Sequence, residues 1–119
     1  MGLTYIKATV INPADPSKRL KVEFLVDSGA MYSVVPKTIL KKLGIKSRET
    51  ETFTLADGTD ITRKVGNALF ALDHSERASP IIFGEKGDTP LLGMVSLEAL
   101  GYILDPLRRE LRPLPMVLG

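Results

Sequence analysis

The sequence has 119 residues, contains no cysteine and has one histidine, His74. Without cysteine, the chain can form neither a disulfide framework nor a metal site with thiolate ligands. A single histidine cannot build a zinc site without several carboxylate partners. These absences exclude a disulfide-stabilised domain and a thiolate metal site.

The chain also has little excess charge and no long apolar run. Sixteen basic and fourteen acidic residues give a net charge of +2, which is too weak to indicate a nucleic-acid partner. No apolar run approaches the roughly 20 residues that span a bilayer. The N-terminus lacks the basic-then-apolar order of a signal peptide. We therefore expect a cytoplasmic protein without a nucleic-acid or membrane partner.

What is present is ordinary for a soluble globular protein, with 44% apolar and 25% charged residues. The length is sufficient for one hydrophobic core and too short for two. We therefore interpret residues 1–119 as a single domain.

Short β-rich segments and frequent turns run through the sequence. The expected strands cover residues 4–10, 19–26, 50–55, 60–65, 68–72, 80–83, 102–104 and 110–112. Short helices are expected over residues 37–43 and 95–100, each ended by a glycine. This pattern predicts an all-β, closed barrel-like domain with two short helices. The order strand, turn, helix and glycine occurs from Phe24 to Gly44 and again from Ile82 to Gly101, which indicates an approximate internal repeat.

The segment Phe24-Leu25-Val26-Asp27-Ser28-Gly29-Ala30 carries the strongest functional signal. Three consecutive apolar residues are typical of a strand buried on both faces, and they lead into an Asp-Ser-Gly turn. Peptide hydrolysis by carboxylates requires two of them close together, sharing one proton. The chain has one such segment, so we expect a second copy of the chain to supply the other carboxylate.

The run from Leu25 to Pro36, LVDSGAMYSVVP, resembles the active-site segment of retroviral-type aspartic proteases, the retropepsins. The likeness is closer to their single-lobe bacterial and archaeal relatives. Leu91-Leu92-Gly93, followed by a helix and by Leu100 to Pro106, is similar to the second signature of that family. The Asp57-Gly58 pair, a strong hairpin signal, falls where these enzymes carry the flap that closes over the substrate.

The resemblance implies a homodimeric endopeptidase that acts on peptides or proteins and requires no metal or cofactor. Asp27 would be the general acid/base, with one copy from each chain. Ser28, Gly29 and Ala30 would support the catalytic turn, with the Ser28 hydroxyl linking the two turns of the dimer. The flap would comprise Ala56, Asp57, Gly58 and Thr59, and Leu91, Leu92 and Gly93 would pack behind the catalytic turn.

Two departures from the retroviral pattern affect the expected dimer. Met31 and Met94 stand where retroviral enzymes have an acidic residue and an arginine, so we expect an apolar contact there and a less polar substrate subsite. The tail from Arg112 to Gly119 carries prolines two residues apart, Pro113 and Pro115. These remove N–H groups along one strand edge, so the tail could still add to one strand, but we expect no four-stranded weave of terminal strands.

Other interpretations stay open from the residues alone. Asp27 could cap a helix or shape a turn without chemistry, and Ser28 and Ser33 could be turn or helix-start hydroxyls. Met31 and Met94 could be core fillers. His74 fits an exposed turn, and Lys37, Lys41 and Lys42 fit a solvated helix face. For function, the alternatives are a catalytically weak or inactive peptide-binding or dimerisation module, and a monomeric structural β-domain without a groove.

Overall fold

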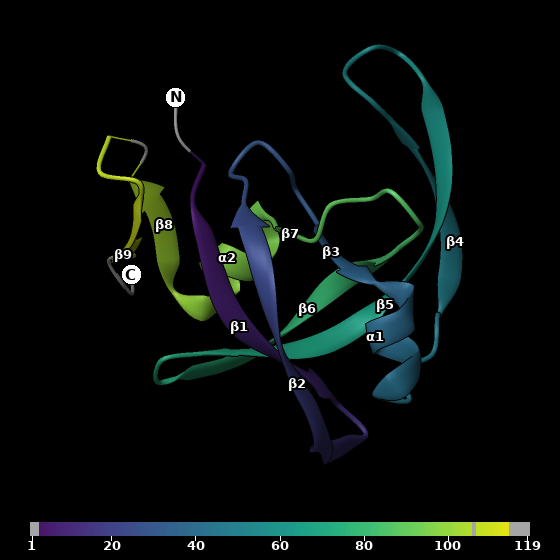
Figure 1. Ribbon diagram of the computed structural model, residues 1–119, viewed down its shortest axis with the longest axis horizontal. Coiled ribbons are helices and arrows are strands. Elements are labelled where there is room, and N and C mark those ends of the chain that lie inside the picture. The colour runs from purple at the N-terminus through teal and green to yellow at the C-terminus, as the bar shows by residue number, and fades with distance from the viewer. Residues whose placement is uncertain (1–2, 106, 115–119) are drawn as a thin grey trace, which may run out of the picture.

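A computed structural model describes residues 3–105 and 107–114, which form nine strands and two short helices (Figure 1). The elements are β1 (Tyr5–Asn12), β2 (Asp15–Val26), β3 (Ser33–Pro36), α1 (Lys37–Lys42), β4 (Glu49–Thr54), β5 (Asp60–Leu72), β6 (Ser75–Gly84), β7 (Leu91–Leu92), α2 (Met94–Leu100), β8 (Tyr102–Asp105) and β9 (Glu110–Pro113). Neither of these helices is long and apolar enough to cross a membrane.

Seven strands form one sheet that closes on itself. The strand order is β1-β2-β7-β3-β6-β5-β4, and β1 also pairs with β5 through Val10 and Phe70. This pairing closes six strands into a barrel, and β4 extends β5 beyond it. The predicted all-β closed barrel with two short helices is therefore confirmed.

The two copies of the predicted repeat pair with each other within the barrel sheet. β2 runs parallel to β7, and β3 runs parallel to β6. β3 and β7 meet in antiparallel pairing at Val34 and Leu91. Each repeat therefore completes the sheet of the other, and the loop after β2 lies against Gly93 and the start of α2.

The core is packed by the inward faces of these strands and by the two helices. Val10, Phe24, Phe70, Ile81 and Leu97 have no exposed surface. The rings of Phe24 and Phe70 pack edge to face, with their centroids 5.8 Å apart. This contact joins β2 to β5 across the barrel interior.

Several element boundaries differ from the sequence prediction. The strands expected over residues 60–65 and 68–72 form one continuous strand, β5. Gly66 does not break that strand, because it marks a close approach: a Cβ there would lie 3.1 Å from the Lys46 carbonyl oxygen and from the Phe83 ring. β2 and β6 begin earlier than expected, at Asp15 and Ser75.

The short strand β3 was not predicted, because its pairing with β6 and β7 is non-local. The predicted helix 37–43 and the last hairpin are present as α1 and as β8–β9. β9 pairs with β8 of the same chain, and the Leu114 N–H bonds the Gly101 carbonyl at 2.7 Å. Pro106 and the end of the predicted tail, Pro115 to Gly119, lie outside the described residues.

The Phe24–Phe70 contact predicts a large loss of stability for Phe70→Ala. Truncating a fully buried phenylalanine removes apolar contacts and leaves a cavity, so we expect the free energy of unfolding to fall by about 3–5 kcal/mol. Urea denaturation at a fixed protein concentration measures this loss. Leu107→Ala is the matched control, because Leu107 is 93% exposed. An equal effect of the two substitutions would contradict this account of the core.

Candidate active site

Asp27 lies at the end of β2, where hydrogen bonds from both sides fix the backbone. The Leu25 N–H donates to the Pro90 carbonyl, and the Val26 N–H donates to the Thr4 carbonyl. The Asp27 N–H donates to the Leu92 carbonyl at 3.1 Å. The backbone that presents the carboxylate is therefore held by the start of β1 and by β7.

The residues after Asp27 form a tight turn around its side chain. The Gly29 N–H donates to Oδ1 of Asp27 at 2.9 Å, and the Ala30 N–H donates to the Asp27 carbonyl at 3.1 Å. Asp27 itself is half-buried, whereas Ser28 and Gly29 are exposed. The carboxylate is thus oriented by a backbone donor and remains accessible from outside.

The segment after β7 packs directly against this turn. The Met94 N–H bonds the Ala30 carbonyl at 2.8 Å, and the Val95 N–H bonds the Met31 carbonyl at 3.0 Å. A Cβ on Gly93 would lie 2.7 Å from the carbonyl carbon and oxygen of Tyr32. Such a contact is too short for any side chain, so glycine is required for the two backbones to meet.

A chain of buried serine hydroxyls lies beneath the turn. Ser33 Oγ accepts a hydrogen bond from the Gly93 N–H at 2.9 Å and lies 2.5 Å from Ser96 Oγ. Ser96 Oγ lies 2.7 Å from Ser79 Oγ. Ser33 is fully buried in β3, so its interpretation as a turn or helix-start hydroxyl is wrong. The buried Ser33 hydroxyl accepts a hydrogen bond from the Gly93 N–H, which would otherwise have no partner there.

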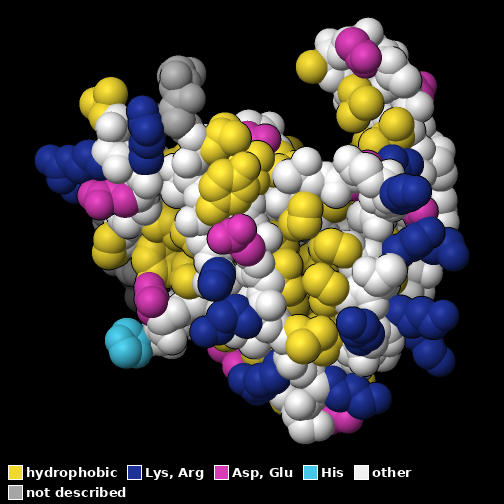
Figure 2. All heavy atoms as spheres, viewed as in Figure 1, with side chains coloured by type: hydrophobic (Ala, Val, Ile, Leu, Met, Phe, Trp, Pro, Cys, Tyr) yellow, Lys and Arg dark blue, Asp and Glu magenta, His cyan; other side chains and the backbone are white. Residues whose placement is uncertain are grey.

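A groove of about 750 Å³ lies over Asp27. Asp27, Gly29 and Ala30 line its floor, together with the apolar side chains of Leu25, Val34, Ile82 and Leu91. Phe53 to Ala56 and Ile61 line the opposite side, from the β4–β5 hairpin. Figure 1 shows this hairpin rising beside the turn that follows β2, and Figure 2 shows the molecule hollowed between them.

The hairpin that overhangs the groove turns at the predicted Asp-Gly pair. Gly58 has a φ of 86°, which favours glycine, and its N–H donates to the Leu55 carbonyl. The Thr59 N–H donates to Oδ1 of Asp57 at 2.9 Å, and this bond lowers the pKa of the Asp57 carboxyl. Of the four predicted flap residues, Ala56 lines the groove, and the other three build the turn.

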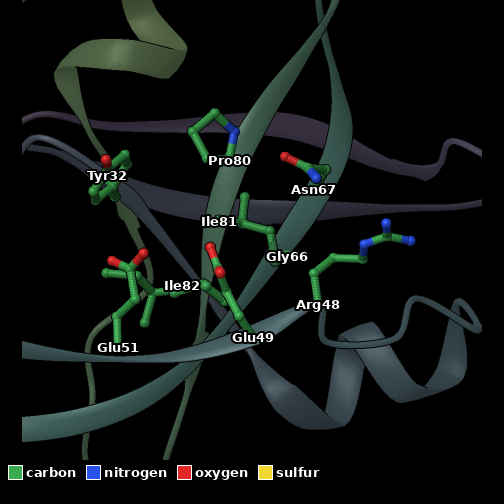
Figure 3. Close-up of a pocket in the computed structure, with 10 residues that line it drawn as sticks. Tyr32, Arg48, Glu49, Glu51, Gly66, Asn67, Pro80, Ile81 and Ile82 are labelled. Carbon is green, nitrogen blue, oxygen red and sulfur yellow. The ribbon is translucent and has the colours of Figure 1, made fainter.

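Tyr32 connects the floor of the groove to the hairpin. Its ring packs edge to face against Phe53 of β4, with the centroids 6.3 Å apart. Tyr32 lines the groove and also a second hollow of about 130 Å³, where Glu49, Glu51, Asn67 and other residues surround it (Figure 3). The ring therefore stands between the two spaces, a role that the sequence analysis missed.

An ion pair closes one side of the groove. Nε and Nη2 of Arg63 in β5 bond the two carboxylate oxygens of Asp88 at 2.8 and 3.1 Å. These bonds hold the pKa of the Asp88 carboxyl below its usual value, and they raise the pKa of Arg63. The pair joins the hairpin strand to the loop before β7. Sequence reasoning missed it, because 25 residues separate the partners.

Met31 and Met94 line one hollow of about 360 Å³ beside Ser28 and Gly29. Met31 is 64% exposed and Met94 is 37% exposed. Their interpretation as core fillers is therefore wrong. The two thioethers instead form an apolar surface next to the turn that follows Asp27.

His74 and the lysines of the predicted solvated face, Lys37, Lys41 and Lys42, do not line the groove. His74 is exposed in the turn between β5 and β6, as its sequence context predicts. Among residues 3–105 and 107–114, no three His, Cys, Asp or Glu side chains are grouped so that they could hold a metal ion.

The closed β-barrel, the Asp-Ser-Gly turn and the overhanging hairpin together define a retropepsin-like lobe. A family model described as aspartyl protease matches residues 9–95, and the chain belongs to this family. A retropepsin-like aspartic protease from Rickettsia conorii shares 26% sequence identity and a TM-score of 0.53, over 87% of this chain and 85% of that chain. None of the curated protein sequences matches the chain. The predicted family resemblance is confirmed, and membership implies a peptide hydrolase.

The serine chain predicts that Ser33→Ala destabilises the fold. The substitution leaves the buried Gly93 N–H without its partner, so we expect a loss of about 1–3 kcal/mol in the free energy of unfolding. Urea denaturation of Ser33→Ala and of the exposed control Ser47→Ala measures the difference. Equal stability of the two variants would contradict a supporting role for the hydroxyl.

The Arg63–Asp88 pair predicts a pH-dependent contribution to stability. Because the pKa of Asp88 is lower in the folded state, the contribution is complete above the unfolded carboxyl value of about 3.9. It is lost as the pH falls through the folded value. We therefore expect the difference in unfolding free energy between wild type and Asp88→Asn to shrink as the pH falls below about 4. Urea unfolding across pH measures it, and a pH-independent difference would contradict the prediction.

Proposed function

We propose that this protein is a homodimeric aspartic endopeptidase in which Asp27 of each chain forms the catalytic dyad. The observation that carries the proposal is the half-buried Asp27 carboxylate on a fixed turn at the floor of an open groove. Membership of the aspartyl protease family supports it. The described chain offers one such turn, so the second carboxylate comes from another copy.

The chemistry requires one charged and one protonated carboxyl group. The charged group takes a proton from a water molecule, which then attacks the scissile carbonyl. The protonated group donates a hydrogen bond to the carbonyl oxygen. Two carboxylates about 3 Å apart share one proton, because both cannot ionise readily. The Gly29 N–H on Oδ1 holds the Asp27 carboxylate in a single orientation for this exchange.

Exposed apolar side chains around the catalytic turn support dimerisation. Met31 and Met94 lie beside Ser28, and Leu3 and Tyr5 are 65% and 53% exposed. Tyr5 pairs with Leu25 in the strand that leads to Asp27. A second copy that brought its own Asp27 close would cover such a surface, with the Met31 and Met94 side chains as an apolar contact. Single lobes of the retropepsin type generally dimerise.

The groove suits an extended peptide. Apolar side chains line its floor and its hairpin side, and a peptide strand lying between them could place alternate side chains on the two faces. The Ala56–Thr59 turn stands above this path as a flap. The outer floor carries Met31 and Tyr32, which favours apolar substrate side chains there.

Asp27→Asn tests the catalytic role. Removing the general acid/base should lower kcat by about 10²–10⁴-fold or more, while the fold and the dimer persist because the amide has the same shape. Digestion of a peptide library by both proteins measures activity, and sedimentation at micromolar concentration measures assembly. Full activity of Asp27→Asn would exclude the dyad, and a monomeric wild type would favour a structural domain.

The shared proton also predicts the pH dependence of cleavage. Activity should follow a bell-shaped curve with its maximum at mildly acidic pH, because the dyad is active with one proton and inactive with none or two. Measuring kcat/KM across pH, with and without a transition-state mimic of the pepstatin type, tests this. A mimic that binds to a protein without activity at any pH would favour the inactive peptide-binding module.

A further inference from the structure

Lysine side chains surround a hollow that shares no lining residue with the groove. We call it the lysine hollow; its volume is about 630 Å³. Lys37, Lys41, Lys46 and Lys64 form its rim, and Ile45 and Phe83 form its floor. The rim comes from α1, from the segment after it and from β5.

Positive charge is concentrated at this site although the whole chain carries only +2. Residues 37–48 contain five basic residues and no acidic one, and three of the five, Lys37, Lys41 and Lys46, line the hollow. Glu85 is the acidic residue that lines the hollow, and Nζ of Lys37 binds it at 2.5 Å. Figure 2 shows Lys and Arg side chains gathered over the side of the molecule that carries α1 and the β4–β5 hairpin. Lys37 and Lys41, two of the three lysines of the predicted solvated face, thus also lie at the edge of a concave surface.

The floor of the lysine hollow is apolar. Ile45 and Phe83 are each 7% exposed. A ligand that combines carboxylates with an apolar side chain would therefore satisfy both the rim and the floor. Phe83 is too buried to stack on a base, as single-stranded nucleic acids require. The floor also lacks the protruding apolar side chains by which proteins enter a membrane surface. These features favour an acidic peptide.

One tight turn separates the lysine hollow from the groove. The Glu85 N–H bonds Oδ2 of Asp88 at 2.8 Å, and the Asp88 N–H bonds the Glu85 carbonyl at 2.9 Å. Glu85 faces the lysine hollow, where Lys37 holds it, whereas Asp88 lines the groove, where Arg63 holds it. A peptide that left the groove across this turn would reach the lysines.

We propose that the lysine hollow is an accessory site that binds an acidic segment of the peptide substrate outside the active-site groove. That the bound peptide is also a substrate depends on the proposed protease function, whereas the binding of an acidic peptide to the hollow does not. The charge complementarity of the rim, the apolar floor and the position across the 85–88 turn carry the proposal.

Binding is measured first in the Asp27→Asn background, so that no cleavage occurs. The probe is a fluorescent peptide of alternating Glu and Leu, and its Gln and Leu counterpart is the neutral control. Lys46→Glu with Lys64→Glu should raise the Kd of the acidic peptide about tenfold or more, whereas Lys7→Glu with Arg77→Glu, which changes the net charge equally, should change it less than about twofold. The proposal would be overturned if both double variants raised the Kd of the acidic peptide equally, or if the acidic and the neutral peptide bound equally well. So would tighter binding of a single-stranded oligonucleotide or of anionic vesicles.

Cleavage by the protein with native Asp27 separates this inference from the proposed function. A cleavable peptide with an acidic extension should have a lower KM than one with a neutral extension, at similar kcat. Lys46→Glu with Lys64→Glu should abolish that difference, and the matched Lys7 and Arg77 pair should retain it. Cleavage with the same KM for both extensions would overturn the accessory site alone. Selective binding without any cleavage would overturn the protease function and leave the binding site standing.

Discussion

The close approach of Gly93 to the turn after Asp27 is the contact on which the rest of the structure depends. A side chain at position 93 would collide with the Tyr32 backbone at 2.7 Å. Because that side chain is absent, the Leu92 carbonyl accepts the Asp27 N–H, and Met94 bonds the Ala30 carbonyl. The fully buried Ser33 hydroxyl then accepts a hydrogen bond from the Gly93 N–H. The carboxylate is thereby fixed by backbone geometry from two interlocked repeats.

This constraint also organises the surfaces around the site. With β7 between β2 and β3, the 85–90 loop that precedes it lies along the groove and carries Asp88 to Arg63 of the hairpin strand. The same loop carries Glu85 to Lys37 on its other side. Two ion pairs therefore hold one turn between the groove and the lysine hollow. Such partly exposed pairs contribute little to stability individually, so their position matters more than their strength.

Local signals in the sequence predicted much of this arrangement. The apolar run into Asp-Ser-Gly, the Asp57-Gly58 hairpin and the glycines after both helices each depend on neighbouring residues, and the structure has all of these elements. What depends on residues far apart was missed: β3, the continuity of β5 through Gly66, the Arg63–Asp88 pair and the Ser79–Ser96–Ser33 chain. A serine within an otherwise apolar segment was the available signal for the last of these, and the sequence does not say which serines meet.

The central claim is that Asp27 is one half of a catalytic pair completed by a second chain. The most direct test is the distance between the two Asp27 carboxylates in a crystal structure of the assembled protein. The account predicts oxygens within hydrogen-bonding reach, about 3 Å apart, across a two-fold axis. Carboxylates too far apart to share a proton, or a chain that crystallises without a partner at this face, would contradict it.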